Sequence, residues 1–228
     1  VGQIFGYVHD RLFTEDDFVD VENGVLKESV PAQTFTAKVR PGDIKYVDLD
    51  KNGVIDTYDQ MAIGGTENPE IVYGFGVNLR WKDLDFGAMF QGIGRTWRIL
   101  SSNIMPASNK GSMYNIFDNY QDRWTVGNQS QDVFYPRADY GPNANNSQKS
   151  TWWLRNMSFL RLKNLELGYS CPKKWLQGFV ISNARVFVRG TNLLTFSKFN
   201  LWDPELATGD GAKYPAMKSV SVGFDITF

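Results

Sequence analysis

The strongest constraint on what this chain can fold into is a two-residue alternation of apolar and polar side chains. It is clearest at 218–228, where large apolar residues occupy every second position: Val220, Val222, Phe224, Ile226 and Phe228. Successive side chains of a β-strand point to opposite faces, so this run predicts a strand with one apolar and one polar face. Four other segments show the same pattern, at 71–81, 84–97, 158–170 and 184–196.

One of these segments changes phase in its middle. In 158–170, apolar residues fall on even positions up to Leu162 and on odd positions from Leu165 onward. One extra residue in a strand shifts every later side chain to the other face. The sequence therefore predicts a β-bulge near Lys163–Asn164.

The lengths of the strands favour one of two architectures. A two-faced strand suits a soluble β-sandwich, or a membrane barrel that turns its apolar face to lipid. The five segments run from 11 to 14 residues, whereas soluble strands average about 5–6 and membrane strands need about 9–11. We therefore expect an all-β fold, a transmembrane antiparallel β-barrel with long extracellular loops. The alternative is a secreted calcium-binding β-sandwich for adhesion or glycan binding.

The connections between the segments alternate in length, as in a membrane barrel. Two are short, at 82–83 and 171–183, and two are long, at 98–157 and 197–217. Outer-membrane barrels have short periplasmic turns and longer extracellular loops, so we expect the long connections outside. The region 1–70 is expected to be extracellular loop as well, with the end of a strand at 1–8.

Five strands are too few to close a membrane barrel, which needs about eight or more. We therefore expect the chain to be the C-terminal part of a longer protein whose other strands precede Val1. Its first residues, VGQIFGYVHD, lack the basic and apolar regions of a signal peptide, as an internal start predicts.

Composition excludes several classes of function. Lys+Arg number 24 against Asp+Glu 25, and no long basic run occurs, so we expect no nucleic-acid partner. Cys171 is the single cysteine, which rules out an intrachain disulfide. No G-x-S-x-G, Walker or H-E-x-x-H motif is present, so we expect no enzymatic activity.

The segment DLDKNGVIDTYD, at 48–59, has the spacing of a calcium loop. EF-hand-type loops place oxygen ligands at positions 1, 3, 5, 7, 9 and 12, with glycine at position 6. Gly53 holds position 6, and the expected ligands are Asp48, Asp50, Asn52, the carbonyl of Val54, Asp56 and Asp59. We expect a structural Ca²⁺ here, although Asp at position 12 reaches less far than the usual Glu. The alternative is a series of solvated Asx-turns.

Four tryptophans are candidates for binding a substrate by ring stacking: Trp124, Trp152, Trp153 and Trp202. The alternatives are an aromatic belt at the membrane interface for Trp152 or Trp153, and packing within the loops for Trp124 and Trp202. Four cationic residues fall on polar strand faces that we expect to face a barrel lumen: Arg161, Lys163, Arg185 and Arg189. They would contact substrate, or form ion pairs that solvate the lumen.

Several segments, in order and spacing, resemble the C-terminal region of SusC/RagA-type TonB-dependent outer-membrane transporters. They are GDIKYVDLDKNGVIDTYDQMAIGGTENPEIVYGFG at 42–76, MSFLRLKNLELGYSCPKKWL at 157–176, NARVFVRGTNLLTFSKFNLWDPE at 183–205, and YPAMKSVSVGFDITF at 214–228. The likeness covers most of the chain and is weakest at 98–150 and before Gly42.

The resemblance implies a barrel of about 22 strands around a plug domain, in the lipid of the bacterial outer membrane. It implies import of oligosaccharides or peptides with a SusD-like surface lipoprotein, energised by TonB through an N-terminal part. Phe228 resembles the terminal aromatic residue that barrel assembly machinery recognises. Asp203-Pro204-Glu205 resembles the DPE motif of the family's last exterior loop.

Overall fold

The computed structural model describes residues 2–101, 117–139, 141, 143–178 and 180–228. Its regular elements are almost all strands, with one turn of α-helix, α1 at Lys173–Leu176. The predicted all-β class is therefore confirmed. Within the described ranges, no helix has the length and apolar character needed to cross a membrane. The chain divides into two compact units, 1–67 with 97–155 (the loop unit) and 68–96 with 156–228 (the sheet unit).

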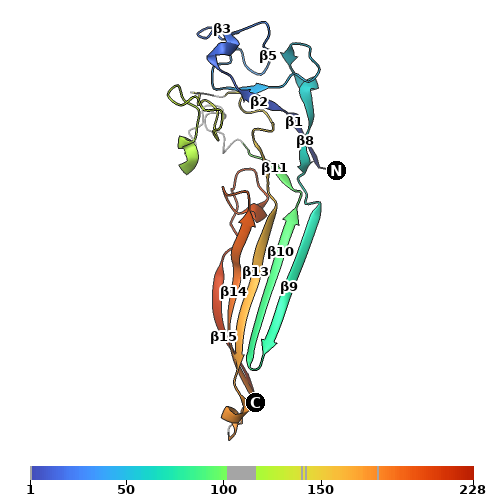
Figure 1. The fold of residues 1–228 in the computed structure, drawn as a ribbon, viewed down its shortest axis with the longest axis vertical. Helices are drawn as coiled ribbons and strands as arrows, with labels where there is room; N and C mark the ends of the chain where they lie inside the picture. Colours follow the sequence, from blue (N-terminus) through green and yellow to red (C-terminus); the bar gives the residue numbers. More distant parts are fainter. Residues whose placement is uncertain (1, 102–116, 140, 142, 179) are drawn as a thin grey trace. The chain divides into compact units, whose positions relative to one another are not determined.

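The sheet unit is a five-stranded antiparallel sheet with strand order β15-β14-β13-β10-β9. Figure 1 shows these strands side by side. Their bounds are Ile71–Trp81 for β9, Leu84–Gly94 for β10, Phe159–Ser170 for β13, Asn183–Ser197 for β14 and Ser219–Thr227 for β15. Each strand pairs with the next along the chain, so the sheet is a simple meander.

The second strand is shorter than the expected segment 84–97. Arg95 has a φ of 52°, a left-handed conformation that interrupts a strand. Trp97 instead begins β11 (Trp97–Ile99), which pairs with β12 (Leu154–Asn156).

The bulge lies where the change of phase predicts it. Against β10, the register jumps from Leu162 to Asn164, which leaves Lys163 without an opposite residue. Against β14, Lys163 faces two residues, Asn192 and Leu193. Asn192 has a φ of 53°, and asparagine is one of the few residues that adopts this conformation at low cost.

The two faces of this sheet differ in chemistry. One carries large apolar side chains that are exposed, among them Phe75 at 55%, Val222 at 61% and Phe224 at 72%. The other carries glycines and charged residues. A soluble sandwich would bury the apolar face against a second layer, so its exposure argues against that alternative and agrees with a face turned to lipid.

The loop unit contains short strand pairs, which are β1–β8, β2–β6, β3–β4 and β5–β7. The bounds of these strands are Gln3–Tyr7, His9–Leu12, Phe18–Asp20, Val25–Leu26, Ala32–Gln33, Ile44–Tyr46, Val54–Ile55 and Gln60–Thr66 for β1 to β8 in order. Four 3-10 turns occur in the described chain, η1 at Glu15–Asp17, η2 at Thr57–Asp59, η3 at Asp118–Gln121 and η4 at Pro204–Leu206, the last in the sheet unit.

Polar side chains, as well as apolar ones, hold the loop unit together. Phe13, Phe18 and Val39 form a small apolar cluster. Asp43 is fully buried and accepts hydrogen bonds from Arg137 at 3.1 Å and from Asn146 at 2.9 Å. These bonds join segments about a hundred residues apart and satisfy the polar atoms of a carboxylate that is fully buried.

Candidate functional site

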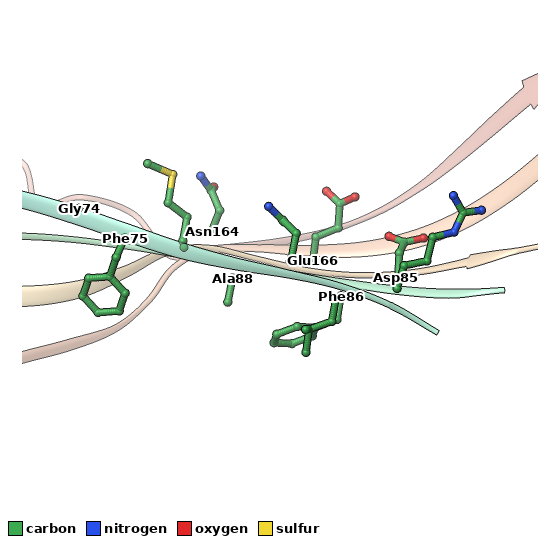
Figure 2. A pocket seen from close by; sticks show the side chains of 13 residues that line it. Gly74, Phe75, Asp85, Phe86, Ala88, Asn164 and Glu166 are labelled. Atoms are coloured by element: carbon green, nitrogen blue, oxygen red, sulfur yellow. The ribbon is translucent and has the colours of Figure 1, made fainter. Parts of the chain in front are cut away.

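Arg185 is the centre of an ion-pair network on the polar face of the sheet. Its Nη2 donates to Asp85 and to Glu166, each at 2.5 Å, and its Nη1 donates to Asp225 at 3.2 Å. The three acids lie on β10, β13 and β15, so one guanidinium links four strands. Figure 2 shows Asp85, Asn164 and Glu166 on one side of the sheet, with Phe75, Phe86 and Ala88 on the other.

The network continues along β14. Arg189 donates to Glu166 at 2.7 Å, which makes Glu166 a shared acceptor. Phe187 lies between Arg185 and Arg189 on the same face of β14, and their guanidinium groups lie 4.8 and 5.2 Å from its ring. Cation–π contacts and ion pairs together fix the positions of both guanidinium groups.

Arg161 and Lys163 form a second cluster with the segment that follows β14. The Arg161 side chain is 2% exposed and donates to Asp203 and, at 2.7 Å, to Glu205. Lys163 also donates to Glu205 at 2.7 Å. Asp203 caps η4 by accepting from the Glu205 amide at 3.0 Å, so the Asp203-Pro204-Glu205 motif is tied to the sheet.

All four cations predicted to face a lumen therefore lie on the polar face and are paired with carboxylates. This arrangement agrees with the solvating ion pairs weighed from the sequence, because each positive charge is already neutralised. Orientation of this face toward a lumen stays a prediction. Sequence reasoning did not single out the acidic partners Asp85, Glu166 and Asp225, although their alternation with apolar neighbours places them on the same face.

The acidic segment at 48–59 follows β6 closely and contains β7 and η2. Carboxylate oxygens of Asp48, Asp50 and Asp59 lie within 4.8 Å of one another. Gly53 has a φ of 85°, which glycine adopts without strain. The apolar residue at position 8, Ile55, is fully buried and anchors the loop.

Backbone N–H groups already donate hydrogen bonds to some of these carboxylate oxygens. Asp48 accepts from the amides of Lys51 and Gly53 at 2.7 and 2.8 Å. Desolvation, which raises the pKa of Asp48, is outweighed by these hydrogen bonds, and the pKa lies below its ordinary value. Asp56 is not part of the three-acid cluster and instead accepts from the Tyr58 amide at 2.7 Å. Three carboxylates can supply hard oxygen ligands, and metal binding stays a prediction.

The four candidate tryptophans pack against other residues and are not exposed to solvent as open stacking surfaces. Trp124, Trp152 and Trp153 are buried, and the ring N–H groups of Trp152 and Trp153 donate to the carbonyls of Phe134 and Asn146. Trp202 is half-buried and packs edge-on against Phe199 at 4.9 Å. Packing within the loops thus accounts for these rings in this structure, and stacking on a substrate stays a prediction.

Phe228 is 81% exposed after the last strand. Its use as an assembly signal stays a prediction.

Known proteins resemble the whole chain. No protein-family model matches it. It is 32% identical to TonB-dependent receptor P26 of Formosa agariphila, in an alignment that covers 100% of this chain and 24% of that protein. It is 24% identical to TonB-dependent receptor SusC of Bacteroides thetaiotaomicron, over 86% of this chain and 19% of that protein.

Solved structures agree with these relatives. The structure of the RagAB peptide transporter matches with a TM-score of 0.69 and 25% identity, over 99% of this chain and 22% of the matched chain. The RagAB peptide importer in its closed-closed state matches with a TM-score of 0.65 and 27% identity. The chain spans about a quarter of the length of the curated relatives it matches, or less. Over its whole length the chain therefore matches a segment of the SusC/RagA-type TonB-dependent receptors, which are proteins of the bacterial outer membrane.

Proposed function

We propose that the chain forms part of the wall and outer loops of a TonB-dependent importer of oligosaccharides or peptides. The observation that carries this proposal is the two-faced sheet, with exposed apolar side chains on one face and ion-paired charges on the other. In a transporter wall, the first face would contact lipid and the second would line a wet interior.

The dimensions of the sheet support this role. Its strands contain between 9 and 15 residues, and each residue advances a strand by about 3.3 Å. A tilted strand of about 9–11 residues crosses the hydrocarbon core of a bilayer. The strands are therefore long enough to span the membrane.

A SusD-like lipoprotein and the TonB system are the proposed partners. The named relatives support them, since SusC is called a TonB-dependent receptor and RagAB is called a peptide importer. In this scheme the lipoprotein captures the ligand outside, and TonB acts through parts of the receptor that lie beyond this chain.

Uptake by cells tests the proposal. A strain lacking the full receptor should lose uptake of its labelled oligosaccharide or peptide, and restoring the gene should restore uptake. The receptor should also co-purify with a surface lipoprotein and migrate differently on gels before and after heating. A receptor that purifies from the soluble fraction, without detergent, would overturn the proposal.

We also propose that Ca²⁺ stiffens the loop at 48–59. The support is the three-acid cluster together with the buried anchor Ile55. The role is structural, because a filled shell of oxygen ligands leaves no position for a reacting group.

Calcium titration of the receptor tests this loop. Asp50→Asn should weaken Ca²⁺ binding by about tenfold or more, because one of the three clustered carboxylates loses its charge. The fold should be kept, because Asp50 is exposed and its hydrogen bonds stay within the loop. Asp20→Asn is the matched control, since Asp20 is an acid in a similar turn outside the cluster. Equal affinity in both variants, or none in the parent receptor, would contradict a site here.

A further inference from the structure

One end of the sheet gathers exposed aromatic and basic side chains. Trp81 ends β9 at the β9–β10 turn and is 69% exposed, and the Lys82 ammonium in the turn lies 5.0 Å from its ring. The connection between β13 and β14 contains α1, where Lys173, Lys174 and Trp175 are all exposed. We call Lys173, Lys174, Trp175 and the 85% exposed Val180 the basic arm.

Backbone hydrogen bonds place the arm and the turn at the same end. The Ser170 amide donates to the Asp83 carbonyl in the β9–β10 turn at 2.8 Å, and the Cys171 amide donates to Ala184. Beyond the arm, the Ser182 amide donates to Thr227 at the end of β15, also at 2.8 Å. Figure 1 shows the same arrangement, with the C-terminus and the β13–β14 connection at one end of the sheet.

The chemistry of the arm matches a membrane interface. Tryptophan prefers the level of the lipid headgroups, and lysine extends its charge to the phosphates while its methylene chain lies on apolar surface. Within the two connections, 82–83 and 171–183, Lys82, Lys173 and Lys174 outnumber the one acid, Asp83. Short barrel connections lie on the periplasmic side, where the leaflet consists of phospholipid.

We propose that the basic arm docks on the periplasmic leaflet and selects anionic phospholipid headgroups through Lys173 and Lys174. This inference rests on the proposed function, since it needs the sheet to span the membrane. Trp175 and Val180 enter the interface, and the two lysines supply the preference. Each basic residue near an anionic surface contributes about 1 kcal/mol, which is about a five-fold preference at low salt.

Fluorescence quenching by brominated lipid tests the arm in the full-length receptor. Cys171→Ser removes the single cysteine of this chain, Val180→Cys carries a bimane probe, and any other cysteine of the receptor is replaced. The receptor is reconstituted in vesicles of phosphatidylethanolamine and phosphatidylglycerol, and one of the two lipids is brominated at a time. We expect quenching by brominated phosphatidylglycerol to exceed quenching by brominated phosphatidylethanolamine several-fold at equal lipid content.

Charge variants identify the cause. Lys173→Gln with Lys174→Gln should abolish the preference, and so should high salt, because both remove the attraction to anionic headgroups. Lys27→Gln with Lys38→Gln is the matched control, since both lysines are exposed in the loop unit.

The remaining outcomes overturn the inference. Equal quenching by both lipids would leave only an apolar anchor, and quenching by neither would place the arm in water or against a protein. A preference for phosphatidylglycerol that survives the double substitution would show that Lys173 and Lys174 do not select the lipid. Failure of the receptor to insert into vesicles, seen by unchanged gel migration on heating, would instead count against the proposed function.

Discussion

Arg161 combines the deepest burial of any cation on the sheet with two carboxylate partners. Removing one partner of a buried ion pair leaves a charge without compensation, which costs about 3–5 kcal/mol. This cluster fixes the segment that follows β14 to the sheet at Asp203 and Glu205.

Arg161→Met should therefore destabilise the receptor by about 3 kcal/mol or more and release the 197–217 segment. Urea unfolding in vesicles measures the first effect, and faster proteolysis at this segment reports the second. Arg95→Met serves as the control, because the Arg95 side chain is 73% exposed and its pair with Glu70 spans 3.5 Å. An exposed pair of this kind contributes about 0–1 kcal/mol, so equal losses in both variants would contradict the role of Arg161.

Asp17 gives the loop unit a dependence on pH. Burial raises the pKa of Asp17, but hydrogen bonds from Arg11, Thr14 and Lys45 outweigh it and hold the pKa well below its usual range. A carboxyl whose pKa is depressed on folding stabilises the fold above its unfolded pKa of about 4, and this contribution is lost as the pH falls further.

Amide hydrogen exchange near Phe13 and Phe18 should therefore quicken, after correction for the intrinsic pH effect, as the pH falls below about 4. Asp17→Asn should be less protected at pH 7, by about 1–3 kcal/mol, and should show a weaker pH dependence. Asp16→Asn is the neighbouring control, since Asp16 is exposed. The same pH dependence in both variants would assign the effect to another group.

At the scale of elements, the bulge at Lys163 of β13 keeps the apolar side chains on one face, and Asn192 lies opposite it on β14. Without it, residues after Lys163 would turn their apolar side chains to the polar face. The conformation of Asn192 is the local requirement, because a β-branched residue in the left-handed region costs about 1–2 kcal/mol.

Asn192→Val should lower the free energy of unfolding by at least that amount, whereas Asn192→Gly should cost less. Glycine keeps the backbone conformation and loses only the hydrogen bond from Asn192 to the Met217 carbonyl, at 3.1 Å. Thermal unfolding followed by circular dichroism compares the two variants. A valine variant as stable as the glycine variant would show that the bulge does not need this conformation.

The sheet could be read from the sequence because each strand carries its own alternation over many residues. The loop unit could not, since its strands contain two to seven residues and pair over long separations, as β1 does with β8. The odd numbers of Arg185 and Arg189 place both residues on one face of their strand. The register that brings Asp85 to Arg185 depends on the geometry of the turns, which the alternation does not give. Burial of Trp153 depends on segments that pack from elsewhere in the chain and leaves no local signal.

At the scale of the whole molecule, the proposed function requires one sheet face in lipid and the other in a wet interior. The apolar face would be a liability in water, because large exposed apolar patches promote aggregation. In a bilayer the same face is favourable, and the ion-paired face needs water or protein against it. Membrane placement therefore explains both faces together.

The most direct test is the accessibility of spin labels placed along β15 of the full receptor in vesicles. Labels at Val220, Val222 and Phe224 should collide with oxygen, which concentrates in lipid, and labels at Ser219, Ser221 and Asp225 should collide with a water-soluble nickel complex. We predict that accessibility to oxygen and accessibility to the nickel complex alternate, in opposite phase, every two residues along the strand. Uniform access to the nickel complex along the strand would contradict a membrane-spanning sheet.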